Sequence, residues 1–144
     1  MISLSMKEYD SSQEKLIKIK GKIGKLLDTY FIEVYFIEKD GMKYYDFFYH
    51  NYAHLDFFVK QSTEITEQEI ISAFKEMLSI LKNPIEKKKI ADDSIKRGAD
   101  EEDEEECNLI RLEVDNYEKH IEKFILEAEG IKKSPRNWNG KVWD

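Results

Sequence analysis

Four side chains near the middle of the chain could carry metal or acid–base chemistry. His50 and His54 flank a short turn, and Asp46 and Asp56 lie close by in the sequence. Imidazole and carboxylate groups are suitable ligands for zinc or iron. However, their spacing matches no structural zinc pattern, and the single cysteine, Cys107, is far away in the sequence. We therefore expect these histidines to line a turn, and we predict no metal site.

A second candidate pair is Glu33 and Asp46, which would lie one step apart on the same face of a β-hairpin. Two neighbouring carboxylates can act as general acid and general base. The sequence supplies neither a nucleophile motif nor a nucleotide-binding loop beside them. We therefore predict that the protein is not an enzyme and uses no cofactor.

An uninterrupted acidic run is the third candidate. It comprises Asp100, Glu101, Glu102, Asp103, Glu104, Glu105 and Glu106. A calcium loop needs a glycine and spaced ligands, and this run has neither. Because such a block repels itself, we predict that residues 92–106 form a flexible, solvated acidic loop. Contact with a partner protein, or mimicry of nucleic acid, is the alternative interpretation of the run.

The elements that would position these side chains are strands rich in aromatic residues. Twelve of the eighteen aromatic residues fall between positions 30 and 58. All of them except Tyr52 lie in three segments that favour antiparallel strands, 30–37, 44–49 and 55–59. Asp40-Gly41 between the first two segments is a strong signal for a two-residue hairpin turn. This turn sets the register and places Val34 opposite Phe47.

The predicted hairpin has two different faces. One is apolar apart from tyrosine hydroxyls and should pack on helices; it carries Ile32, Val34, Phe36, Tyr45, Phe47 and Tyr49. The other mixes aromatic side chains with carboxylates and should be partly wet; it carries Glu33, Tyr35, Ile37, Tyr44, Asp46 and Phe48.

The first thirty residues fit two structures. Apolar and polar residues alternate over 2–6 and 17–23, which favours two strands joined by a polar turn around Asp10. The alternative is a helix that starts at a capping box of Ser11 and Glu14. Its apolar face would comprise Leu16, Ile19, Ile23, Leu26, Leu27 and Tyr30. We favour the hairpin and keep the helix as the alternative.

The middle of the chain continues with a well-delimited helix. Thr66 and Glu69 form a capping box at its start, and Asn83-Pro84 ends it. After the acidic run, residues 109–114 alternate between apolar and polar side chains and predict one more strand.

A second main helix follows. Asp115 with Glu118 predicts its start, and Gly130 predicts its end. The remaining residues, 131–144, form a basic tail in which we expect Trp138 to dock on the domain. Together the patterns predict an α+β fold in one domain, residues 1–144. The fold would have an antiparallel sheet of about five or six strands, two main helices on one face and the inserted acidic loop.

Composition limits the function. The chain has 144 residues, 41% of them hydrophobic, and a formal net charge of −7. This charge argues against general binding to phosphate backbones, and it suits a basic partner protein. The first ten residues lack the apolar stretch of a signal peptide, and no run of apolar residues is long enough to span a membrane. We expect a cytoplasmic protein without a membrane or nucleic-acid partner.

In size, acidity and lack of catalytic motifs, the chain resembles bacterial toxin-immunity proteins and phage-encoded anti-defence proteins. This resemblance implies a small protein that inhibits a partner by surface contact. We predict that Glu33, Tyr35, Tyr44, Asp46, the acidic run and Trp138 form the contact.

Two alternatives remain. One is a ligand-binding or enzymatic module with an aromatic pocket lined by Tyr35, Tyr44, Phe48 and His50. The other is a structural subunit of an assembly, which would expose an apolar patch.

Overall fold

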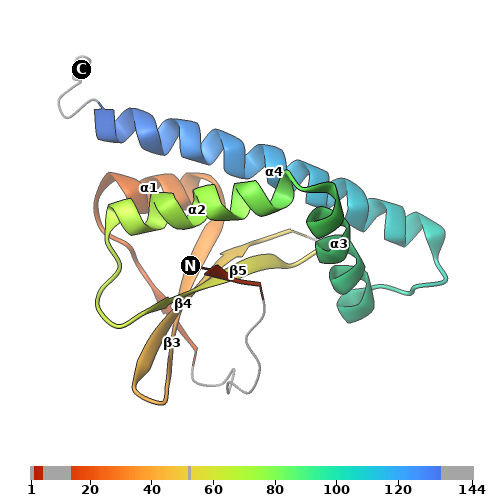
Figure 1. Ribbon diagram of the computed structural model, residues 1–144, viewed down its shortest axis with the longest axis horizontal. Coiled ribbons are helices and arrows are strands. Elements are labelled where there is room, and N and C mark those ends of the chain that lie inside the picture. Colours follow the sequence, from red (N-terminus) through yellow and green to blue (C-terminus); the bar gives the residue numbers. More distant parts are fainter. Residues whose placement is uncertain (1, 5–13, 52, 134–144) are drawn as a thin grey trace.

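The computed structural model describes residues 2–4, 14–51 and 53–133. Within them, an antiparallel sheet of five strands has the order β1-β5-β4-β3-β2. The strands are β1 (Ile2–Ser3), β2 (Lys15–Ile17), β3 (Ile32–Lys39), β4 (Met42–Tyr49) and β5 (Leu55–Gln61). The helices are α1 (Gly21–Thr29), α2 (Glu67–Leu81), α3 (Pro84–Gly98) and α4 (Glu104–Lys133). The chain therefore has the predicted α+β fold, with the helices gathered on one side of the sheet (Figure 1).

The β3–β4 hairpin has the predicted register. Val34 lies opposite Phe47. The turn residues Asp40 and Gly41 have φ angles of 54° and 75°, as a two-residue turn with left-handed positions requires. The local sequence is therefore sufficient to fix this register.

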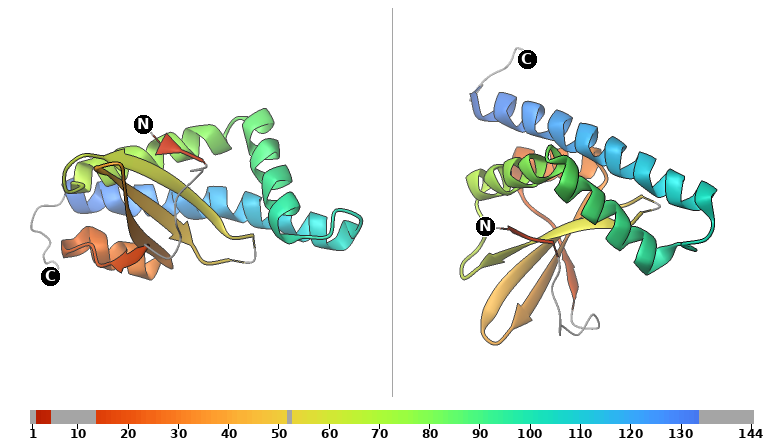
Figure 2. Two further views of the ribbon diagram at one scale, coloured as in Figure 1. Left: turned by 90° about the horizontal axis from the view of Figure 1, so that it is seen from below. Right: turned by 45° about the vertical axis from the view of Figure 1, so that its right-hand side comes forward.

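The apolar face of the hairpin packs against the helical layer, as predicted. Val34 and Phe47 are buried there. The ring of Phe47 stacks on Phe57 at a centroid distance of 5.3 Å and meets Phe74 of α2 edge-on at 5.5 Å. α4 lies between α1 and α2 across this face (Figure 2). Such contacts bury large apolar areas, which is the main stabilising contribution in a fold of this size.

The predicted N-terminal hairpin is wrong. β1 pairs with β5 and β2 pairs with β3, so the two short strands lie at opposite edges of the sheet. Residues 21–29 form α1, because Ile23, Leu26 and Leu27 recur at helical spacing and are buried. The alternative helix is therefore correct for this part only; Ser11 of its proposed capping box lies outside the described residues.

Close packing of the backbone explains why position 24, inside α1, is a glycine. A Cβ atom built at this position would lie 1.7 Å from the backbone oxygen of Ile19. The residues that connect β2 to α1 thus pack directly on the helix backbone, which no larger side chain would permit. The packing offsets the intrinsic cost of about 1 kcal/mol for a glycine in a helix.

The start of α2 follows the predicted capping box. The Glu69 N–H donates to Thr66 Oγ1 over 3.2 Å, and the Thr66 N–H donates to Glu69 Oε1 over 2.9 Å. α2 ends before Asn83, as predicted, but Asn83 also begins another helix. Its Oδ1 accepts from the N–H groups of Ile85 and Glu86, with Pro84 in the first turn. The same dipeptide therefore ends one helix and caps the next.

The predicted loop at 92–106 is wrong as secondary structure. α3 extends to Gly98 and α4 begins at Glu104, so only 99–103 connects them. Asp103 Oδ1 accepts from the Glu106 N–H over 3.2 Å and so caps α4. Glu106 Oε1 accepts from the Asp100 N–H over 2.9 Å. Because carboxylates at a helix N-terminus are favoured by the helix dipole, the acidic run is compatible with ordered structure.

The predicted strand at 109–114 is also wrong, since these residues belong to α4. Their alternation coincides with a longer helical pattern in which Cys107, Ile110, Val114, Tyr117 and Ile121 are buried. This stripe faces α2 and α3, and the helical period prevails because it buries more apolar surface than a sixth strand could.

Polar contacts join the layers at their margins. Lys87 of α3 pairs with Glu118 of α4 over 2.8 Å. The Tyr30 hydroxyl donates to Glu127 Oε1 over 2.5 Å, and burial together with this carboxylate raises the pKa of Tyr30 to about 12. In the described ranges, no helix combines the length and apolar character needed to cross a bilayer.

Candidate functional site

The predicted contact residues fall in two separate places. Glu33, Tyr35, Tyr44 and Asp46 lie on β3 and β4, on the strand face that points away from the helical layer. The acidic run lies at the α3–α4 connection, at the right-hand end of the molecule in Figure 1. No hydrogen bond or ion pair between described residues joins the two sets. Trp138 lies outside the described residues.

Glu33 is the centre of a polar cluster on the strand face. The Tyr35 hydroxyl donates to Glu33 Oε1 over 2.7 Å, and His50 Nε2 contacts the same oxygen. These hydrogen bonds, first that of His50 and then that of Tyr35, lower the pKa of Glu33. The hydrogen bond to Glu33 is also the main cause that raises the pKa of Tyr35 to about 12. The result is a carboxylate kept ionised and oriented near the surface.

Aromatic rings surround this cluster. The ring of Phe48 meets His50 edge-on at a centroid distance of 4.7 Å and stacks on His54 at 6.0 Å. Tyr35 meets Phe48 edge-on at 6.5 Å. Tyr44 lies further along β4, opposite Ile37 and Lys60. The structure thus brings Glu33, Tyr35, Phe48 and His50 together. The predicted hairpin register placed Glu33, Tyr35 and Phe48 on one face but did not include His50.

Asp46 has a different environment from Glu33. Its side chain is only 4% exposed, and Oδ1 has no hydrogen-bond partner. Burial is the main cause that raises the pKa of Asp46 to about 9, and the charge of Asp56 and a hydrogen bond with Asp56 raise it further. Burial also raises the pKa of Asp56. A hydrogen bond between two carboxyl groups requires a proton, so the raised pKa values of Asp46 and Asp56 favour a shared proton at neutral pH.

This carboxyl pair could be inferred only in part from sequence. β4 pairs with β5 so that Phe47 lies opposite Phe57, which puts Asp46 and Asp56 on one face and diagonal to each other. The alternation of β5 predicted the face of Asp56, but the pairing of β4 with β5 was needed to make the two carboxyls neighbours. Neither carboxyl lines a cavity found among the described residues.

Two large apolar side chains near the cluster are exposed. Leu16 of β2 is 60% exposed and lies opposite Tyr35. Phe31 is 68% exposed and has a φ of 58°, a left-handed conformation that costs a bulky residue energy. Its carbonyl accepts from the His50 N–H over 3.3 Å, which continues the β3–β4 ladder by one residue. No pattern in the sequence distinguishes Phe31 from the strand that follows it.

The described residues bear on two expectations, the absence of a metal site and the alternative aromatic pocket. No group of three or more His, Cys, Asp or Glu side chains among them could hold a metal ion. Three cavities lined by described residues do not include Tyr35, Tyr44, Phe48 or His50. One of the three, of about 500 Å³, opens on the other side of the sheet.

Comparison of the chain with protein-family models, curated proteins and solved structures finds no match.

Proposed function

We propose that the protein is a small acidic binding protein that inhibits or neutralises another protein by surface contact. The contact surface, here named the Glu33 face, comprises Leu16, Phe31, Glu33, Tyr35, Phe48 and His50. The observation that carries the proposal is the exposure of Leu16 and Phe31, 60% and 68%, beside the ordered cluster around Glu33.

The energetics of this surface favour a protein partner. Exposed apolar and aromatic side chains gain free energy when a partner removes them from water. Tyrosine and tryptophan are frequent among interface residues that contribute most to affinity. Glu33 is already oriented by Tyr35 and His50, so binding would cost little additional side-chain ordering.

The conformation of Phe31 gives a second argument. A left-handed φ is uncommon for a large aromatic residue and typically costs roughly 1–2 kcal/mol, whereas glycine or asparagine adopts it more readily. An exposed side chain does not repay this cost within the folded chain. A role in recognition would explain why a phenylalanine occupies the position.

The net charge indicates the kind of partner. A protein of net charge −7 associates faster with a basic surface than with a neutral one. Cytoplasmic targets such as nucleases or nucleic-acid-guided complexes have such surfaces, and toxin-immunity and anti-defence proteins act on targets of this kind. The alternative, an aromatic ligand pocket at the same face, receives no support from the three cavities described above, because none of them contains its four residues.

The test compares two exposed apolar side chains on different surfaces. Phe31→Asn removes the aromatic ring but suits the left-handed backbone; Leu126→Ala truncates a side chain that is 69% exposed on α4. The wild type and both variants are used to capture partners from the source cell, and bound proteins are quantified by mass spectrometry. The captured partner is then purified for affinity and activity measurements.

We expect Phe31→Asn to weaken partner binding by about 30-fold or more, the effect of an interface hot spot, and Leu126→Ala to leave it unchanged. The wild type should also lower the activity of the purified partner. The free energy of unfolding of Phe31→Asn should equal that of the wild type or exceed it by up to about 1 kcal/mol. A partner whose binding is unaffected by Phe31→Asn and Tyr35→Ala would refute the Glu33 face, and a partner that keeps full activity would refute inhibition.

A further inference from the structure

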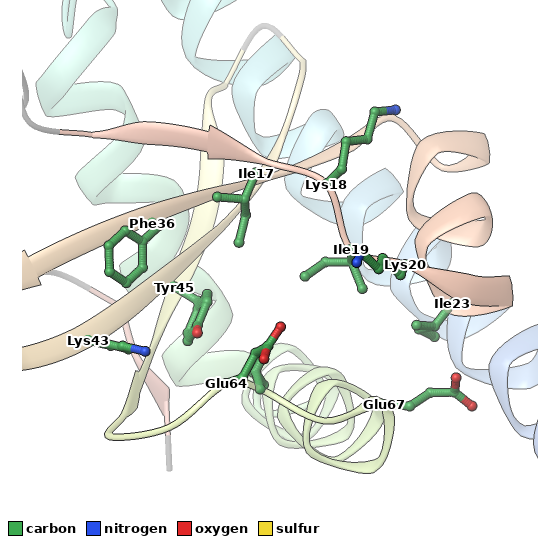
Figure 3. Close-up of a pocket in the computed structure, with 11 residues that line it drawn as sticks. Ile17, Lys18, Ile19, Lys20, Ile23, Phe36, Lys43, Tyr45, Glu64 and Glu67 are labelled. Atoms are coloured by element: carbon green, nitrogen blue, oxygen red, sulfur yellow. The ribbon is translucent and has the colours of Figure 1, made fainter.

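One cavity forms an open groove on the helix side of the sheet, separate from the Glu33 face. Its volume is about 500 Å³, within the range of roughly 300–1,000 Å³ that is typical of ligand sites. It lies between the β2–α1 connection, the β3–β4 hairpin and the residues that precede α2 (Figure 3). Its floor is apolar and comprises Ile17, Ile19, Ile23, Phe36, Tyr45 and Ile65.

The walls of the groove are fixed by packing. The close approach of Ile19 to Gly24 holds the β2–α1 connection on α1. On the side of the β3–β4 hairpin, the floor residues Phe36 and Tyr45 are cross-strand neighbours, and their ring centroids lie 6.0 Å apart. The groove is therefore formed by elements that have little freedom to close it, and its shape does not depend on flexible side chains alone.

Charges of both signs converge on this apolar floor. The Lys43 ammonium points toward Tyr45, and the Glu64 carboxylate points into the space between Tyr45 and Ile19 (Figure 3). Lys20 lies at the far wall. Lys18 instead extends outward and pairs with Asp28 over 3.0 Å.

The charges at the groove have no ion-pair partner within the fold. Lys43 is half-buried, and Lys20 and Glu64 are exposed. Among the described residues, neither Lys20, Lys43 nor Glu64 has an ion-pair partner within 4.0 Å, although Glu38 lies opposite Lys43 on β3. Charged side chains beside apolar floor residues gain most when a ligand of opposite charge displaces water. A purely anionic ligand would meet Glu64 and Glu67, which also lines the groove, and a purely cationic ligand would meet Lys20 and Lys43.

We propose that this groove binds a short apolar peptide with free ends, a zwitterion whose carboxylate is bound by Lys43 and whose ammonium is bound by Glu64. The apolar side chains of the peptide would cover the isoleucines and Phe36. This site is independent of the Glu33 face, because the two lie on opposite sides of the sheet.

The probe is tri-leucine, compared with its N-acetyl, C-amide and doubly blocked forms by calorimetric titration of the full-length chain. We expect tri-leucine to bind with a Kd of about 1 mM or tighter, and each blocked end to weaken binding at least about tenfold. Amide NMR shifts should change at Ile17, Ile19 and Ile65, which line the groove.

Variants assign each charge. Lys43→Ala should weaken binding of tri-leucine but leave binding of the C-amide form unchanged. Glu64→Gln should weaken binding of tri-leucine but leave binding of the N-acetyl form unchanged. Lys60→Ala, which lies on the opposite sheet face, and Glu101→Gln, in the α3–α4 connection, serve as controls and should change neither. Three outcomes would overturn the proposal. Tri-leucine and its doubly blocked form could bind with equal affinity, tri-leucine could show no saturable binding, or the control variants could weaken binding as much as Lys43→Ala and Glu64→Gln do. Partner binding through Phe31 is measured separately, so failure here leaves the proposed function unaffected.

Discussion

Replacing Asp46 by asparagine should stabilise the protein, by an amount that depends on pH. Asparagine has nearly the shape of a protonated aspartic acid and can donate to Asp56, but it carries no charge to bury. The unfolded state has the ordinary pKa of 3.8, whereas burial and Asp56 raise the pKa of the folded state to about 9. Between these values the folded protein binds a proton that the unfolded chain does not.

The sign and size of the effect follow from proton linkage. Because the folded pKa is raised, the contribution of the Asp46 carboxyl to stability is fully present below about pH 4 and is lost as pH rises through about 9. The stabilising effect of Asp46→Asn is therefore absent near pH 4 and grows as pH rises. Each pH unit in this window lowers the free energy of unfolding of the wild type by about 1.4 kcal/mol relative to Asp46→Asn. At pH 7 the difference reaches on the order of 4 kcal/mol, an upper bound because the two carboxyls titrate together.

The assay is urea denaturation of the wild type and Asp46→Asn at intervals from pH 4 to pH 9. Differences between the two free energies of unfolding cancel the titration of all other groups. Glu101→Gln removes one exposed negative charge and controls for the change in net charge. A difference that does not vary with pH, or a variant less stable than the wild type at pH 7, would show that Asp46 does not hold a proton in the folded state.

Substitutions at three further positions test which contacts stabilise α1 and α4. Gly24→Ala should lower the free energy of unfolding by about 1–3 kcal/mol, because its Cβ would collide with the Ile19 carbonyl; Gly130→Ala in α4, which meets nothing within 4 Å, should instead raise it by up to about 1 kcal/mol. Thermal unfolding measures both, and the same sign for the two variants would contradict the close approach. Asp103→Ala should cost about 1 kcal/mol by removing the cap of α4, while Asp103→Asn should be nearly neutral; equal effects in chemical denaturation would show that the carboxylate does not act as a cap.

Local sequence determined the elements whose signals lie within a few residues. Asp40-Gly41 has the left-handed conformations that a two-residue turn demands, so the register of β3 and β4 follows from it. The capping box of Thr66 and Glu69 fixes the start of α2 in the same way. The same register brought Glu33, Tyr35 and Phe48 together on one face.

Tertiary packing decided the segments whose apolar spacing fits two periods. Residues 17–23 and 109–114 alternate like strands, yet 21–29 and 109–114 are helical because Ile23, Leu27, Ile110 and Val114 contribute to the common core. The acidic run is another example. Its self-repulsion predicts a loop, but its carboxylates cap α4 and lie at the favourable end of the helix dipole once α4 is in place.

The character of the two carboxylates on the strand face also depended on the tertiary structure. Sequence placed Glu33 and Asp46 on one face but could not tell which would be buried. Pairing of β4 with β5 brought Asp56 to Asp46 and produced a buried, proton-sharing pair, whereas His50 and Tyr35 keep Glu33 ionised near the surface. Alternation along a strand determines which face a side chain is on; burial, and therefore its charge, is determined by the side chains that the neighbouring strands bring beside it.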